Sequence, residues 1–131
     1  MTLPENVAKT FDDPASVKVL TSVGTNGQPH SIVCGSIRVV SPDTVIVGEI
    51  LMKTTASNFA GNKKAAILVV AGRTSYLVNA EVKQRVSEGP MLDGMNEALA
   101  KMGLKASAVW LFEPKEVFDQ SATPNAGKKI V

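Results

Sequence analysis

The pattern of apolar and polar positions along the chain predicts a mostly β fold. Apolar and β-branched residues gather in short stretches separated by turn signals, at residues 17–23, 29–40, 44–50, 65–71, 75–87 and 108–112. Between the first two stretches, Asn26-Gly27 suits the positive backbone angles of a hairpin turn. Residues 75–87 alternate between apolar and polar, as in a strand with one buried face. We therefore predict six strands, most of them joined by hairpins.

Three other segments have a helical pattern. Residues 4–11 are expected to form a short N-terminal helix, and residues 53–61 a helix of about two turns that Thr54 or Thr55 can cap. The third helix is expected at residues 90–102, where the apolar side chains fall on one stripe: Leu92, Met95, Leu99 and Met102.

Length and composition suit one folded unit. The chain has 131 residues, of which 44% are hydrophobic and 20% charged, enough for one buried core. We expect a single domain over residues 1–131, ending in a polar C-terminal tail at 120–131 that has too little apolar surface to order by itself. Six evenly spaced strands with two or three short helices favour a closed antiparallel barrel, because closure removes exposed strand edges. An α+β sandwich is the alternative.

The composition argues against several classes of protein. The longest apolar run, residues 65–71, is far shorter than the roughly 18 residues that a membrane-spanning helix needs. Pro4 and Glu5 stand where a signal peptide would be basic and then apolar, so we expect a cytoplasmic protein. Cys34 is the only cysteine and His30 the only histidine. We therefore expect neither a disulfide within the chain nor a metal site.

The distribution of charge is more informative than the net value of +2, which argues against the concentrated basic face of a nucleic-acid binder. Between Glu49 and Glu81 the chain has no acidic residue, while four cations fall in this interval: Lys53, Lys63, Lys64 and Arg73. This cationic third of the chain could hold a small anion such as a phosphate. Equally, its lysines could serve only to keep the ends of two buried stretches soluble.

The best candidate for an anion site lies where the third strand runs into the second helix. Lys53 precedes two hydroxyls here, those of Thr54 and Thr55. The first amides of a helix lack internal partners and carry the positive end of its dipole, so together with these side chains they could bind a phosphate. An ordinary surface helix is the alternative. Neither GxxxxGK[ST] nor a GxGxxG after a strand occurs, so the corresponding nucleotide sites lack support.

A run of small residues, Val33-Cys-Gly-Ser36, interrupts the second strand. A glycine within a strand often marks the close approach of a ligand, and a flat ring could rest there; a bend of the barrel explains it equally well. Glu49 is the only carboxylate near the candidate site, so paired-carboxylate chemistry lacks its partner, and no GxSxG occurs. We assign no catalytic residue. If the protein is an enzyme, a cofactor carries the reaction.

The order of these segments resembles the FMN-binding split-barrel family, typified by pyridoxamine 5′-phosphate oxidase and by small FMN-binding proteins. The likeness covers residues 17–116 and rests on GTNGQPH, VCGSIRVV, TVIVGEI, MKTTASN and YLVNA in this order. Its most specific element is KTxxxN, matched by Lys53, Thr54 and Asn58. The resemblance implies a six-stranded antiparallel split barrel that forms a homodimer, with FMN in a groove at the interface.

The resemblance also implies roles for particular residues. Lys53 and Thr54, with Thr55 and Asn58, would bind the FMN phosphate. Two strand segments would lie along the ribityl chain and the flavin ring, and these comprise Val33, Cys34, Gly35, Ser36, Val47, Gly48 and Glu49. The chain is shorter than true pyridoxamine phosphate oxidases and lacks their arginine-rich phosphate motif, so we do not expect that activity. It is expected to be a flavin-dependent oxidoreductase or electron carrier with a small-molecule or protein redox partner; a deazaflavin is the alternative cofactor.

A second class of function stays open on the sequence. The chain could be a small β-barrel binding module without a redox role, for example for RNA, in which Lys63, Lys64 and Arg73 would meet phosphates. Its aromatic content of 5% argues against this hypothesis, because few side chains beyond Tyr76 and Phe59 could stack on bases.

Overall fold

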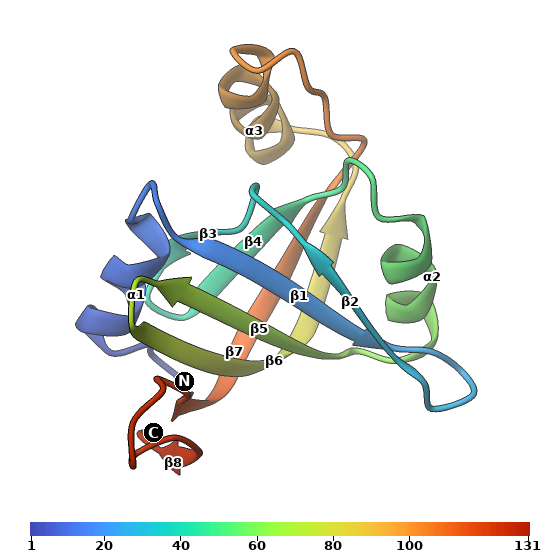
Figure 1. Ribbon diagram of the computed structural model, residues 1–131. Helices are drawn as coiled ribbons and strands as arrows, with labels where there is room; N and C mark the ends of the chain where they lie inside the picture. Colours follow the sequence, from blue (N-terminus) through green and yellow to red (C-terminus); the bar gives the residue numbers. More distant parts are fainter.

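A computed structural model describes all 131 residues as one curled antiparallel sheet with three helices (Figure 1). The strands are β1 (Val17–Val23), β2 (Pro29–Val33), β3 (Arg38–Ser41), β4 (Thr44–Gly48), β5 (Lys64–Ala71), β6 (Thr74–Val86), β7 (Val109–Asp119) and β8 (Lys128–Lys129). The helices are α1 (Glu5–Asp12), α2 (Lys53–Gly61) and α3 (Pro90–Ala100). The predicted class, mainly β with short helices, is confirmed.

The sheet is curled but not closed. Its strand order is β2-β1-β5-β6-β7-β4-β3, with β8 paired to the end of β7, so β2 and β3 are its two edges. Pairing between β6 and β7 shifts register twice, between Asn79 and Ala80 and between Val82 and Gln84. Such bulges bend a strand and increase its twist. The expected closed barrel of six strands is thus wrong in both respects: there are eight strands, and an opening, here called the seam, remains between β2 and β3.

Residues 34–37 cross the seam, which is why the apolar run 29–40 does not form the single strand predicted. Cys34 still follows the register of β1 and β2, and its amide donates to the Lys18 carbonyl at 2.9 Å. By residue 36 the chain has changed partner to β4. The change occurs at Gly35, whose φ is not in the left-handed region and where an added Cβ would meet no atom within 4 Å. The crossing therefore does not require glycine, and the space beside Gly35 is open.

Ser36 completes the crossing with its side chain. It stands opposite Gly48, the position that extends the β3–β4 register beyond the pair Arg38↔Ile46. The buried Ser36 hydroxyl accepts from the Gly48 amide at 3.1 Å and donates to the Gly48 carbonyl at 3.2 Å. At this position the Ser36 side chain takes the place of a backbone partner, so the amide and the carbonyl of Gly48 are both hydrogen-bonded.

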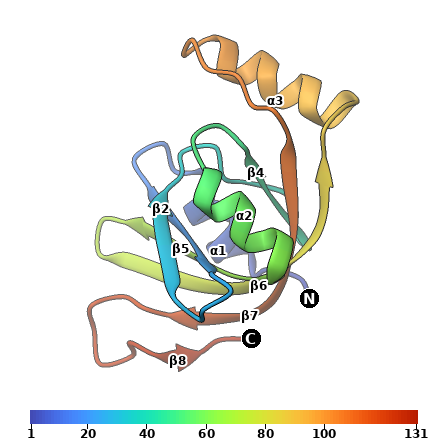
Figure 2. The ribbon, with the colours of Figure 1, turned by 90° about the vertical axis from the view of Figure 1, so that its right-hand side faces the viewer.

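The main core lies inside the curl. Leu20, Ile67, Val78 and Val117 form an inward row across β1, β5, β6 and β7, and all four side chains are fully buried. Helix α1 packs against β3 and β5, and α2 packs against β1 and β2. Helix α3 stands apart at the end of β6 and β7 (Figure 2). A second, smaller apolar cluster joins α3 to β4 and β7.

Three predicted boundaries need correction. Helix α3 ends at Ala100, and Met102 is exposed rather than on the buried stripe. Strand β7 continues through Pro114, because this proline pairs at the first β6–β7 bulge, where the regular ladder is interrupted. The C-terminal tail is held by β7: the Ile130 amide donates to the Val117 carbonyl at 2.8 Å. None of the three helices combines the length and the apolar character that a membrane-spanning helix requires.

The Ser36 crossing predicts a stability effect. In Ser36→Ala, the buried amide and carbonyl of Gly48 lose their partner, so the free energy of unfolding should fall by about 1–3 kcal/mol. Denaturant unfolding measures the change. Ser41→Ala, which removes an exposed hydroxyl bonded only to Asp43, is the matched control and should stay within about 0.5 kcal/mol of the wild type. Equal stability of the two variants would contradict the structural role given to Ser36.

Candidate functional site

Two hollows meet at residues 50–52, in the loop that joins β4 to α2. The seam hollow, of about 300 Å³, is bordered by residues 32–36, by Gly48 and by three residues from the end of α3 and the segment after it: Leu99, Met102 and Leu104. The helix hollow, also about 300 Å³, lies at the start of α2 beside β2. Both hollows share Ile32 and residues 50–52. They therefore adjoin each other along the seam, and together they are here called the groove.

The start of α2 is open to an anion. The helix begins at Lys53 with Met52 as its N-cap residue, and no side chain accepts a hydrogen bond from its first amides. The predicted threonine cap is therefore wrong, because Thr54 and Thr55 lie inside the first turn. No acidic residue occupies this turn. The unpaired amides and the positive end of the helix dipole thus face the helix hollow without a counter-charge from the helix itself.

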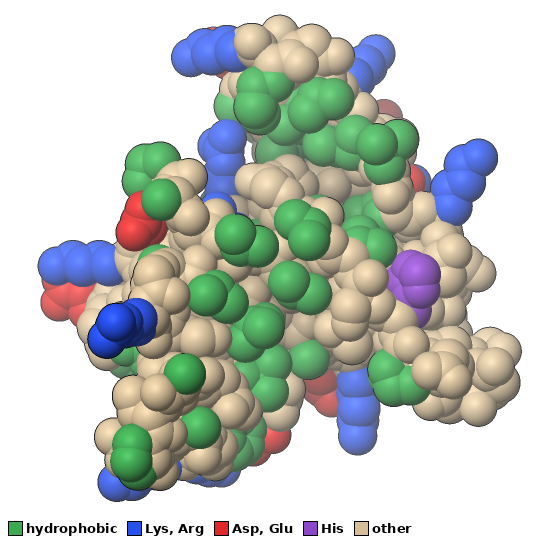
Figure 3. Space-filling view, in the orientation of Figure 1, with side chains coloured by type: hydrophobic (Ala, Val, Ile, Leu, Met, Phe, Trp, Pro, Cys, Tyr) green, Lys and Arg blue, Asp and Glu red, His purple; other side chains and the backbone are tan.

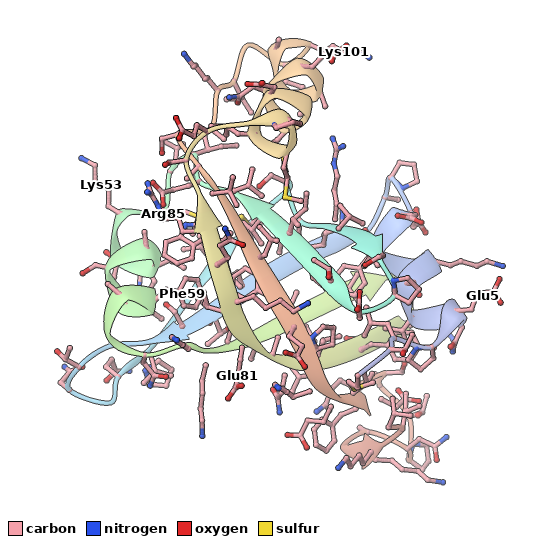
Figure 4. The ribbon with its side chains drawn as sticks, turned by 180° about the vertical axis from the view of Figure 1, so that it is seen from behind. Glu5, Lys53, Phe59, Glu81, Arg85 and Lys101 are labelled. Carbon is pink, nitrogen blue, oxygen red and sulfur yellow. The ribbon has the colours of Figure 1, made fainter.

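The polar side chains predicted to bind a phosphate have different surroundings. Lys53 forms no ion pair, and Figure 4 shows it pointing outward from the start of α2. Thr54 is exposed and borders the helix hollow. Thr55 also borders it but is fully buried, and its Oγ1 has no partner, although buried hydroxyls are normally paired. Asn58 is engaged elsewhere, because its amide donates to the Ser22 hydroxyl at 3.0 Å and so ties α2 to β1.

His30 is a residue of the helix hollow that the sequence did not single out. It lies on β2 and borders the same hollow as Lys53, Thr54 and Thr55. The local sequence offers no signal for this, because His30 follows a hairpin turn and is distant from residue 53 along the chain. Only the packing of α2 against β2 brings them together. The hollow is thus lined by Lys53, His30, Thr54 and Thr55 at a helix start whose first amides are free.

The seam hollow is apolar by comparison. No charged residue lines it, and the Ser36 hydroxyl is engaged by Gly48. Burial raises the pKa of the Cys34 thiol, which keeps it protonated and argues against a nucleophile. Gly48 serves packing, because an added Cβ would lie 3.3 Å from the sulfur of Met95 on α3. The open space beside Gly35 is the part of the wall that a flat ring could approach.

Two of the residues expected along the ring point elsewhere. Val47 is fully buried in the core inside the curl. The carboxylate of Glu49 receives hydrogen bonds from Arg85, with Nε at 3.1 Å from Oε1 and Nη2 at 3.0 Å from Oε2. The Trp110 indole donates to Oε1 at 2.7 Å and the Ser107 hydroxyl to Oε2 at 2.8 Å. Chiefly through Arg85, these donors lower the pKa of Glu49 to about 2.

The residues proposed for RNA binding do not come together. Lys63 and Lys64 follow α2, whereas Arg73 lies in the turn beyond the opposite end of β5. Phe59 is buried against the Trp110 ring, with 5.4 Å between ring centroids. The Tyr76 hydroxyl accepts a hydrogen bond from Asn6 at 3.1 Å. No three side chains of His, Cys, Asp or Glu cluster as a metal site.

No protein-family model and no curated protein matches the chain. Solved structures do match its fold. HupZ from Group A Streptococcus has a TM-score of 0.81 at 19% identity, covering 95% of this chain and 99% of its own. An FMN-binding protein from Syntrophomonas wolfei has a TM-score of 0.81 at 16% identity, covering 91% and 86%. A putative pyridoxamine 5′-phosphate oxidase from Lactobacillus delbrueckii has a TM-score of 0.73 at 21% identity, covering 89% and 93%.

Other solved structures with the same fold have names that refer to a different cofactor or to haem. An F420 reductase matches with a TM-score of 0.70 at 13% identity, and HutZ, a haem storage protein from Vibrio cholerae, with 0.67 at 13%. The likeness to split-barrel proteins is therefore confirmed for the fold. At these identities it does not carry a ligand over to this chain.

The Glu49 cluster predicts a pH dependence of stability. The pKa of Glu49 is about 2 in the folded protein against an ordinary value of 4.5. Its contribution to stability is therefore complete above about pH 4.5 and is lost as the pH falls towards about 2. Denaturant unfolding at several acidic pH values should show a smaller loss of stability in Glu49→Gln than in the wild type. Equal losses over this range would contradict the shifted pKa.

Proposed function

We propose that the groove binds FMN, with the phosphate in the helix hollow and the flavin ring in the seam hollow. The observation that carries this proposal is that two hollows adjoin through shared lining residues, one beside a lysine at an uncapped helix start and the other apolar. The FMN-binding protein of Syntrophomonas wolfei, which has the same fold, supports it.

The donor set of the helix hollow fits a phosphate. Lys53 supplies a positive charge, Thr54 a hydroxyl, and the first amides of α2 the donors that phosphates accept at helix starts. His30 adds a donor from β2. Thr55 also borders this hollow, and its buried hydroxyl has no hydrogen-bond partner within the protein.

The seam hollow fits a flat, mostly apolar ring. Ile32, Leu51 and Leu99 offer apolar contact, and the wall is open beside Gly35. FMN, when bound, would supply hydride or electron transfer. The protein would bind and orient it, as a flavin-dependent oxidoreductase or electron carrier in the cytoplasm. No side chain of the hollow is assigned as a general acid or base.

A deazaflavin cofactor is the second candidate. It also carries a phosphate that Lys53 could bind. A protein named F420 reductase has the same fold. Parallel titrations of the protein with FMN and with a deazaflavin distinguish the two cofactors by affinity.

The phosphate assignment predicts a selective loss of affinity. Lys53→Ala should weaken FMN binding by about 1.5–3 kcal/mol, the range for a hydrogen bond to a charged group. Riboflavin has the same ring and no phosphate, so its affinity should not change. Titration of both flavins, followed by flavin fluorescence, measures the difference.

Lys63→Ala is the matched control, because Lys63 is exposed just beyond the other end of α2. It should bind both flavins like the wild type. An unchanged FMN affinity of Lys53→Ala, or an equal loss for riboflavin, would overturn the placement of the phosphate.

We also propose that two copies associate through the outer face of the sheet. Outward-facing apolar residues form a registered row across five strands: Val33, Val19, Leu68, Leu77 and Phe118. None belongs to the core, and each is half-buried or exposed. Figure 3 shows hydrophobic side chains gathered over β1 and β5 on this face. Val33 also borders the seam hollow, so a second copy here would adjoin the groove.

Charges beside the row suit a second copy of the same chain. A hollow of about 410 Å³ on this face carries two lysines and two glutamates: Lys64, Lys115, Glu81 and Glu116. Because a twofold axis places the same patch on both partners, a surface with equal numbers of both charges can complement itself. A homodimer is therefore the occupant that we propose for this face.

The dimer proposal predicts that a charge within the row separates the copies. Leu68→Glu should elute from gel filtration at the size of one chain, whereas the wild type should elute at the size of two. The matched control is Val40→Glu on edge strand β3, which is half exposed and outside the row, and which should remain dimeric. A monomeric wild type, or a dimeric Leu68→Glu, would contradict the proposed interface.

A further inference from the structure

The most heavily hydrogen-bonded side chain of the molecule lies immediately before the groove loop. The Glu49 carboxylate receives four hydrogen bonds from three side chains, and its ion pair with Arg85 is bidentate. Arg85 also lies over the Trp110 ring, 5.8 Å from its centroid. Bidentate pairs fix the direction of both partners as well as their separation. Glu49 is therefore held in one orientation from several sides.

Three segments of the chain meet at this carboxylate. Glu49 follows the end of β4, Arg85 lies near the end of β6, and Trp110 lies near the start of β7. The end of β6 leads into α3, and Ser107 belongs to the segment by which the chain returns from α3 to β7. Both connections of α3 are thus tied to Glu49. The backbone adds to this link, because the Ser107 amide donates to the Glu49 carbonyl at 3.0 Å.

The walls of the groove depend on the same segments. Residues 50–52 border both hollows. Glu49 precedes this loop and fixes one of its ends. Met52 fixes the other end, because its side chain is buried and it is the N-cap residue of α2. Leu51 between them is 89% exposed and has little packing of its own. Leu99 and Leu104, from the end of α3 and the segment after it, also line the seam hollow.

We propose that the Glu49–Arg85 pair is a positioning device that holds the groove loop and α3 at the separation required by the flavin ring. The proposal rests on the assignment of the ring to the seam hollow. Neither residue lines that hollow, so each acts through the walls and not by contact with the ring. A glutamine cannot replace Glu49 fully, because its amide nitrogen would face a donor of Arg85 and a donor of either Trp110 or Ser107, and a nitrogen of this kind cannot accept a hydrogen bond.

The test measures binding at the ring end of the groove. Glu49→Gln should weaken riboflavin and FMN equally, by about tenfold, because a shifted wall affects the ring that both ligands share. This differs from Lys53→Ala, which should affect FMN alone. Arg85→Lys keeps the charge but loses the two-pronged geometry, and should cause a loss in the same direction. Glu113→Gln is the matched control on β7, because Glu113 pairs with exposed Lys115 and does not border the groove.

A second readout does not need a cofactor. Hydrogen exchange of the ligand-free protein should show faster exchange at residues 50–53 in Glu49→Gln and Arg85→Lys, with the core strands protected as in the wild type. A variant that is less stable overall but has wild-type flavin affinity and wild-type exchange in this loop would overturn the proposal. If the wild type binds neither flavin, the proposed function fails, and loop exchange still decides whether the pair positions the loop.

Discussion

The crossing of the seam depends on two hydrogen bonds between the Ser36 side chain and the Gly48 backbone, because they allow the chain to change partner without leaving buried backbone groups unpaired. Cys34 still pairs with β1, and two residues later the chain is bonded to β4. The chain thereby passes from β2 at one edge of the curled sheet to β3 at the other, with the seam between them. The groove lies along that seam, bordered by the same residues that make the crossing.

The two ends of the groove differ in polarity because different elements border them. At one end, α2 begins without a cap beside β2, and its unpaired amides, Lys53 and His30 create an environment for an anion. At the other end, α3 and the crossing strand enclose an apolar space without a charged side chain. Glu49, which directly precedes the groove loop, lines neither hollow and is ion-paired with Arg85. The arrangement therefore separates charge recognition from ring packing within a single groove.

Local patterns predicted much of the fold, and non-local pairing accounts for the errors. The bounds of β1 and α2 match the predicted ranges, since each is marked by its own residues and turn signals. The run 29–40 reads as one strand because no local pattern shows that a serine side chain can replace a ladder bond. Pro114 reads as a strand end, although the bulge opposite Ala80 accommodates it. For the site, Lys53 and Thr54 were found from a contiguous motif, whereas His30 and the partners of Glu49 come from strands distant in sequence.

The central claim is that the seam groove holds a flavin. The most direct measurement is the visible absorbance spectrum of the protein after mixing with excess FMN and removal of free ligand by gel filtration. The account predicts flavin absorbance bands in the protein peak, at about one FMN per chain because each chain contributes one groove. A colourless protein peak under these conditions would contradict it.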